Sequence, residues 1–259
     1  GKVYRMNVLA IDCSGDILSV GVGRSMDAES TGIRPQKPKH PFREELGHKP
    51  APGSGFVELS IDAGFRHAER VMGAVDHCLS EAGLDPGDLD LLACAGGPGS
   101  FTGLRIGLST IKGLALGLGK PFVLVPTLDA IAAGWEGAAP IVVPVLDARR
   151  SRFYYAVYES GRLAAGPFDD GFESMVRLLH DRSGVIFVGQ DADLLDGAIC
   201  GHSGWSLPRE HRKSSIRSMA SLAIVHYTRS GAARSDAGLV YLRASDAEEA
   251  LNGKENART

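Results

Sequence analysis

A glycine-rich turn is the strongest candidate for chemistry in this sequence. Residues 96–100 (GGPGS) follow the apolar run 91–95 and precede a helical pattern over 102–118. A strand, a glycine-rich turn and a helix N-terminus can present backbone N–H groups and a partial positive charge to an anion. Alternatively, the glycines serve only a tight turn and close packing between strand and helix. The turn alone does not separate these two interpretations.

Two aspartates at predicted strand ends could lie beside this turn. Asp12 ends the apolar run 7–12, and Asp147 ends the apolar run 142–147. In phosphotransferases built this way, such a carboxylate holds a metal and the following turns meet phosphates. Alternatively, each carboxylate only accepts N–H groups of its own turn. We favour the second interpretation for Asp147, whose turn is rich in arginine, and leave both open for Asp12. The candidate degenerate phosphate loop comprises Asp12, Ser14, Gly97, Gly99, Ser100 and Thr102.

Other catalytic or metal-binding patterns are weak. His67 and His77 are ten positions apart, and Val71 stands where a second helical metal ligand would be. We therefore expect no metal site, and expect His67 to be exposed on or beside an interaction face. The sequence has no Gly-x-Ser-x-Gly or His-Glu-x-x-His motif. The basic cluster 149–152 (RRSR) is predicted to be a solvated turn, with a phosphate or partner contact as the alternative.

Composition limits the class of protein. The chain has 259 residues and a formal net charge of -3, which argues against a strong intrinsic nucleic-acid binder. No apolar run approaches the roughly 20 residues of a membrane helix, and the N-terminal residues do not resemble a secretory signal. The four cysteines are scattered and form no Cys-x-x-Cys pair. We expect a reduced, cytoplasmic protein without membrane contact or structural zinc.

The elements that position these residues occur twice. The strand-like runs 7–12 and 17–22 match 142–147 and 153–158, with one extra residue between the second pair of runs. A strand followed by a glycine turn recurs at 185–191, and a closing helix is expected over 215–228. This order predicts a duplicated α/β fold whose two lobes bind ligands in the cleft between them. The predicted parts are a first lobe (1–130) with an irregular insertion at about 24–55, a smaller second lobe (131–243) and a polar tail (244–259).

Two helices of the first lobe are predicted with different faces. Residues 65–82 form an amphipathic stripe, which is typical of a helix with one buried face. The helix over 102–118 contains four glycines, each costing up to about 1 kcal/mol in a helix interior. Such glycines make sense if another element packs very close to this helix. The four are Gly103, Gly107, Gly113 and Gly117.

Several stretches closely resemble the TsaB (YeaZ) family. They are 9–14 (LAIDCS), 96–107 (GGPGSFTGLRIG), 112–115 (KGLA), 145–150 (VLDARR) and 241–243 (YLR). The resemblance extends from about residue 7 to 243, and the glycine-rich string is highly specific. It implies the fold shared by actin, Hsp70, acetate kinase and sugar kinases (ASKHA fold), in agreement with the duplication. The insertion at 24–55 is longer than the family pattern.

The resemblance also implies a function. Proteins of this family are bacterial partners of TsaD in making the threonylcarbamoyl modification on adenosine 37 of certain tRNAs. This sequence lacks the His-x-x-x-His pair with which TsaD holds a metal, and its second lobe lacks a Gly-Gly-His-type adenosine loop. The resemblance therefore implies a largely non-catalytic scaffold without a tightly bound cofactor, ATP and metal belonging to partner subunits. Alternatives from other classes are an independent phosphotransferase using Asp12 and the glycine turn, and a glycoprotease-like peptidase.

The implied partners are TsaD directly, and TsaE and tRNA only through that complex. A homodimer is expected when TsaD is absent, because a surface made for a paralogue can pair with itself. In the family the two helices described above form the partner-binding face. The expected interface residues are His67, Val71, Val75, Gly103, Gly107, Ile111 and Gly113.

Overall fold

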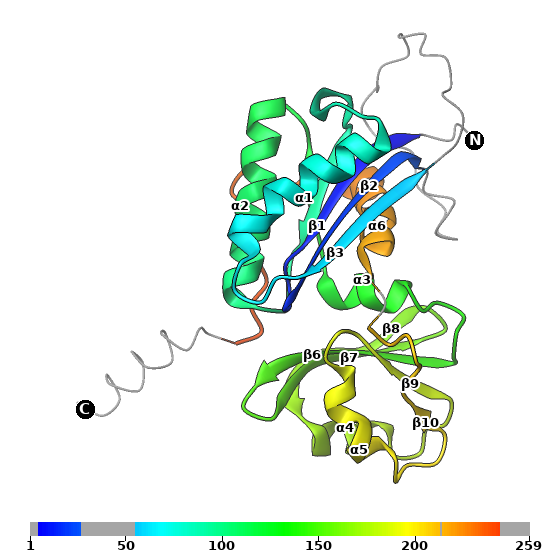
Figure 1. The fold of residues 1–259 in the computed structure, drawn as a ribbon. Coiled ribbons are helices and arrows are strands. Elements are labelled where there is room, and N and C mark those ends of the chain that lie inside the picture. Colours follow the sequence, from blue (N-terminus) through cyan, green and yellow to red (C-terminus); the bar gives the residue numbers. More distant parts are fainter. Residues whose placement is uncertain (1–4, 27–54, 213, 244–259) are drawn as a thin grey trace, which may run out of the picture.

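The computed structural model describes residues 5–26, 55–212 and 214–243, which form two lobes (Figure 1). Each lobe contains a five-stranded mixed sheet. The first lobe contains β1 (Met6–Asp12), β2 (Ile17–Met26), β3 (Phe56–Asp62), α1 (His67–Ala82), η2 (Pro86–Asp88), β4 (Leu91–Ala95), α2 (Phe101–Leu118) and β5 (Phe122–Val125). The second contains β6 (Ile141–Arg149), β7 (Arg152–Glu159), β8 (Arg162–Gly171), α4 (Phe172–Leu179), β9 (Val185–Val188), η3 (Ala192–Leu195), α5 (Asp196–Ile199) and β10 (Trp205–Ser206). The remaining helices are α3 (Thr127–Ala133) and α6 (Ile216–Ser230).

The two sheets have the same topology, so the predicted duplication is confirmed. The first sheet runs β3-β2-β1-β4-β5, and the second in the matching direction runs β8-β7-β6-β9-β10. In both sheets the second strand of the lobe pairs antiparallel with the first and with the third. The fourth strand pairs parallel with the first, and the fifth pairs parallel with the fourth. The second lobe is reduced, because α5 has only four residues where α2 has 18. This is the two-lobed ASKHA arrangement.

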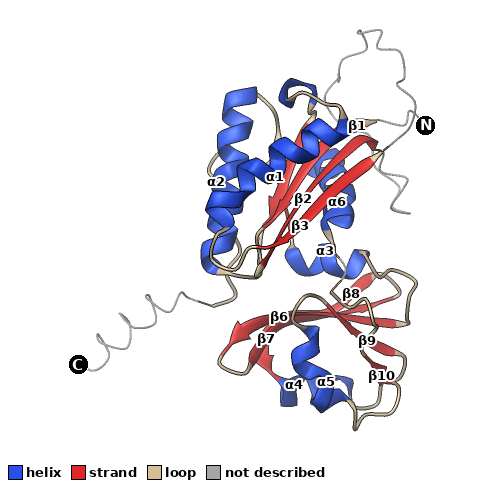
Figure 2. Cartoon of the chain, in the orientation of Figure 1, coloured by secondary structure: helices blue, strands red, loops and turns tan. Residues whose placement is uncertain are grey.

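The first sheet is buried on both faces. Alternating β1 side chains point to opposite sides, because successive residues of a strand face opposite ways. Val8 and Ala10 pack with α6, whereas Leu9 and Ile11 pack with α1 and α2. Figure 2 shows α1 and α2 on one side of this sheet and α6 on the other.

The helices α3 and α6 do not follow the predicted lobe boundary at residue 130. The helix α3 straddles that boundary, and its Leu128 and Ala132 pack with residues of the second sheet. The helix α6, predicted as part of the second lobe, instead fills the core of the first lobe. The second lobe is therefore closed before α6, and the chain returns to complete the first.

A C-terminal strap, defined here as residues 238–243, follows α6 and crosses the glycine turn. The Val240 N–H donates to the Gly96 carbonyl over 2.9 Å. The strap is fastened to the start of α2 by Tyr241, whose ring centroid lies 4.9 Å from that of Phe101. The Arg105 guanidinium lies 3.7 Å from the centroid of the Phe101 ring, and its Nε donates to the Tyr241 hydroxyl over 3.2 Å.

Most predicted elements agree with the structure within a few residues, but β8, α4, α5 and β10 were not predicted. Of the predicted insertion, residues 24–26 belong to β2 and residue 55 lies just before β3, while 27–54 are outside the described residues. The predicted tail, 244–259, also lies outside them. Among the helices described, none has the length and apolar character needed to cross a membrane.

Candidate functional site

The glycine turn is packed directly on the turn that follows β1. A Cβ at Gly99 would overlap the Ser14 backbone, and one at Gly103 would overlap the Cys13 carbonyl oxygen. Because only hydrogen fits at these positions, the close approach explains both glycines. A hydrogen bond of 2.6 Å from the Ser100 N–H to the Ser14 carbonyl joins the two turns.

Some backbone donors at the glycine turn are used within the protein. The Ser100 N–H is bound to Ser14, and the Gly103 N–H donates to the Ser100 side chain over 3.3 Å, so that Ser100 caps α2. Gly97 is covered by the C-terminal strap, since a Cβ there would overlap the Val240 carbonyl. Thr102 remains exposed at the cavity described below. Close packing thus accounts for Gly97, Gly99 and Gly103, and a phosphate at this turn would have to compete for the Ser100 N–H.

The two aspartates hold equivalent turns in the two lobes. The Ser14 N–H donates to Asp12 Oδ1 over 2.8 Å, and the Arg149 N–H donates to Asp147 Oδ1 over 2.7 Å. This i to i+2 bond is an Asx turn, which carboxylates form at strand ends. Each aspartate thus performs the structural role considered for it, and the duplication extends to individual hydrogen bonds.

Asp12 and Asp191 are carboxyl groups whose pKa values are raised by burial. Burial raises the pKa of Asp12 above its ordinary value, against the opposing effects of hydrogen bonds from Ser14 and of His67. Burial also raises the pKa of Asp191, which accepts the Asp147 N–H over 2.9 Å. Ionisation of these groups opposes folding, because burial penalises the charged form.

Asp12→Asn is expected to increase the stability of the protein at neutral pH. Unfolded Asp12 loses its proton near the ordinary pKa of 3.8, whereas the folded protein keeps the proton to higher pH. Between the two pKa values the folded state binds more protons, so stability falls as pH rises through this window. Asparagine does not titrate and retains an oxygen for the Ser14 N–H.

Urea unfolding between about pH 4 and pH 8 tests this expectation. The free energy of unfolding of the wild-type protein is expected to fall more steeply with pH than that of Asp12→Asn. The residual slope of the variant would reflect other groups, including Asp191. Parallel pH profiles for the two proteins would contradict a raised pKa at Asp12.

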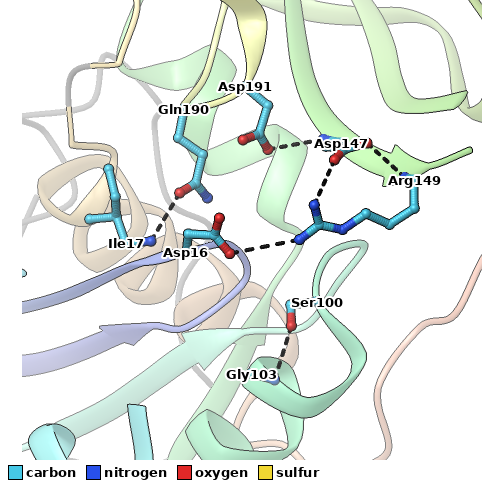
Figure 3. A network of polar contacts seen from close by, with 8 residues as sticks. All are labelled: Asp16, Ile17, Ser100, Gly103, Asp147, Arg149, Gln190 and Asp191. Atoms are coloured by element: carbon cyan, nitrogen blue, oxygen red, sulfur yellow. Dashed lines mark hydrogen bonds and ion pairs between the residues drawn. The ribbon is translucent and has the colours of Figure 1, made fainter. Parts of the chain in front are cut away.

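Both lobes contribute to a cavity of about 400 Å³. Its walls include the two Asx turns, the first turn of α2, Asp191 and the C-terminal strap. Figure 3 shows Arg149 extending toward Asp147 and Asp16. Arg149 lies at this cavity and contacts carboxylates of both lobes, with nitrogen–oxygen distances of 3.1 Å to Asp147 and 3.8 Å to Asp16. In the same basic cluster (149–152), the Arg152 Nε lies 2.7 Å from Asp169 Oδ1. This cluster is therefore paired in part with acidic groups of the same chain. Tyr241, Arg243 and Asp191 were not predicted as site residues.

The predicted interface residues are mostly in the core. His67, Val71 and Val75 on α1 are 4%, 2% and 2% exposed, because this face of the helix packs onto the first sheet. Gly103, Gly107 and Ile111 form the equivalent buried face of α2. The placement of these six residues on a partner-binding surface, including the expectation that His67 is exposed, is corrected accordingly. Gly113 alone of the seven is exposed.

The outer faces of the same helices carry a different set of residues. Leu116 on α2 is 86% exposed. Among the residues that the structure describes, no heavy atom outside the helix's own backbone and chain neighbours lies within 4 Å of a Cβ built at Gly113 or Gly117. Phe65, just before α1, is fully exposed, and Met72 is exposed on the helix itself. We call Gly113, Leu116 and Gly117 the outer α2 stripe.

Catalytic metal chemistry has no candidate ligand cluster in the parts of the chain that the structure describes. No group of three or more His, Cys, Asp or Glu side chains there is placed to hold an ion. The three acidic residues at the cavity are among those searched.

Comparison with known proteins gives consistent matches. Residues 61–192, about half of the chain, match the family model described as TsaD: tRNA N6-adenosine threonylcarbamoyltransferase. The protein named tRNA threonylcarbamoyladenosine biosynthesis protein TsaB is 33% identical over 133 residues in Bacillus subtilis, covering 49% of this chain and 58% of the relative. Its namesake in Escherichia coli is 40% identical over 95 residues, covering 36% and 41%. The chain thus spans about half the length of these curated relatives.

A solved structure resembles almost the whole fold. It is a Pseudomonas aeruginosa protein described as uncharacterized with similarity to peptidase YEAZ, 22% identical to this chain. The alignment covers 92% of this chain and 100% of that one, with a TM-score of 0.67. At this identity the match supports the shared fold.

Proposed function

The chain belongs to the TsaD-related TsaB (YeaZ) family, and from this premise we propose that it is a non-catalytic subunit in tRNA threonylcarbamoyladenosine biosynthesis. Its role would be to bind a TsaD-type threonylcarbamoyltransferase and hold it in a competent arrangement. In this proposal ATP and any metal are bound by partner subunits. The ATPase partner TsaE and tRNA would be reached through that complex.

The outer α2 stripe is the observation that carries this proposal. Glycine in a helix interior costs about 1 kcal/mol relative to alanine. Neither Gly113 nor Gly117 is required by packing within the described chain, since a Cβ at either would meet open space. Small residues on an exposed helix allow another helix to approach closely, and the adjoining Leu116 offers an apolar side chain for it to cover. The stripe therefore supports association with a folded partner.

The same stripe supports self-association when the partner is absent. A patch that pairs with a paralogous helix can pair with its own copy around a twofold axis. The two complexes would then exclude each other, because both need the outer α2 stripe.

Light scattering during size-exclusion chromatography tests the proposal. The protein alone, then mixed with TsaD from the same organism, is expected to change from a homodimer to a complex with one copy of each chain. In a reconstituted tRNA modification assay, omission of this chain is expected to abolish most of the product. Failure to form the complex together with unchanged modification in its absence would overturn the proposal.

A further inference from the structure

The side chain of Gln190 joins the two lobes. Gln190 follows β9 in the second lobe, and its Oε1 accepts the Ile17 N–H from the first lobe over 3.1 Å. Figure 3 shows this side chain extending to the turn between β1 and β2. No role for Gln190 was predicted from the sequence.

Gly15 is shaped for this contact. A Cβ at Gly15 would overlap the side-chain amide of Gln190, so the amide lies directly against the Gly15 backbone. Gly15 is not among the residues with positive φ, so an alanine there would meet no backbone strain. Space for Gln190, rather than an unusual backbone conformation, explains a glycine at this position.

A second contact reaches the same turn from the other hairpin. Arg149 lies 3.8 Å from Asp16, the residue between Gly15 and Ile17. Both of these side chains are more than 60% exposed, and an exposed ion pair of this kind contributes little to stability. Of these two contacts, the partly buried hydrogen bond from the Ile17 N–H to Gln190 is therefore the principal polar link at this turn.

The Gln190–Gly15 contact also lies between two cavities. Gly15 borders the cavity of about 400 Å³, whereas Gln190 borders a second cavity of about 230 Å³ that extends to Asp12 and Arg212. Ser14 lines both. The chain's own amide thus occupies the cleft at the point where the two spaces meet.

We propose that Gln190 is an interlobe clasp, which fills the cleft at Gly15, divides it into two cavities and holds the lobes in one arrangement. This inference is independent of the proposed function, because it concerns the isolated chain. It identifies Gln190 as a positioning residue with no role in chemistry. The clasp would keep the surfaces on both lobes at a fixed relative orientation without a bound ligand.

Hydrogen exchange at the Ile17 amide tests the clasp. In Gln190→Ala this amide loses its acceptor, and its exchange is expected to accelerate by about fivefold or more. Gly15→Ala is expected to give the same acceleration although Gln190 is intact, because the new methyl displaces the amide. Leu194→Ala, an exposed position in the same segment, serves as the matched control and is expected to leave Ile17 exchange unchanged.

Small-angle X-ray scattering of the same three variants separates a clasp from a local hydrogen bond. Gln190→Ala and Gly15→Ala are expected to show a larger radius of gyration than the wild-type protein and Leu194→Ala. Faster Ile17 exchange with an unchanged radius of gyration would overturn the clasp, as would unchanged exchange in both variants. All measurements use the chain without its partners, so they stand whether or not TsaD binding is demonstrated.

Discussion

Leu116→Asp is expected to weaken association with the TsaD-type partner by roughly 100-fold or more, because a carboxylate would be buried where a leucine now offers apolar surface. Leu116 is 86% exposed in the isolated chain, so the substitution removes no core contact. The unfolding midpoint of the variant is therefore expected to match that of the wild-type protein. Calorimetric titration of each variant with the partner gives the affinities.

Two matched variants sharpen this experiment. Leu194→Asp introduces the same charge at an exposed leucine of the second lobe and is expected to leave association unchanged. Gly113→Ala is expected to stabilise the isolated chain by about 1 kcal/mol through helix propensity, yet to weaken association by preventing close approach. Wild-type affinity in both Leu116→Asp and Gly113→Ala would place the partner-binding surface elsewhere.

Gly103→Ala is expected to lower the free energy of unfolding by about 3 kcal/mol or more. The added methyl would overlap the Cys13 carbonyl oxygen, which belongs to the backbone directly after β1. Relief requires α2 to move away from the turn after β1, which breaks the packing around the glycine turn. Urea denaturation followed by circular dichroism measures the loss.

Gly107→Ala is the control for Gly103→Ala on the same buried face of α2. Its added methyl would lie 3.7 Å from the nearest atoms, those of Cys13, which is ordinary van der Waals contact. The variant is expected to be as stable as the wild-type protein or more stable by up to about 1 kcal/mol. Equal stability of Gly103→Ala and Gly107→Ala would contradict the tight approach of α2 to Cys13.

The sequence predicted the duplicated architecture well because that architecture depends on local patterns. Buried strands that end in aspartate, and a glycine turn between strand and helix, are visible in short windows. The strand β8 was missed because Gly166-Pro167 interrupts its pattern. Proline lacks an N–H donor, but it is tolerated in β8 because this strand lies at the edge of its sheet.

The interface prediction failed for a different physical reason. An apolar stripe shows that a helix face must be covered, but it does not show whether the chain's own sheet or another molecule covers it. The buried stripe of α1, including Val71 and Val75, packs against the first sheet. The glycines of α2 similarly divide into Gly103 and Gly107, which face inward, and Gly113 and Gly117, which face outward. Only the three-dimensional arrangement distinguishes the two pairs.

The Gln190 contact lay beyond sequence reasoning because it joins residues 173 positions apart. Glycine at position 15 was visible, but its neighbour across the cleft depends on how the two lobes meet. The same holds for the strap, whose Tyr241 contacts Phe101 from the far end of the chain.

The position of α6 has a consequence for protein synthesis. This helix supplies one side of the first lobe's core, including Ile216, Met219 and Ala223, although it is the last helix described. During synthesis β1, β4 and β5 therefore emerge from the ribosome long before α6, which covers their second face. A nascent chain that ends before Ile216 would expose an apolar sheet surface, while the second lobe has already emerged with its own core. The lobe that begins first is thus the lobe that finishes last.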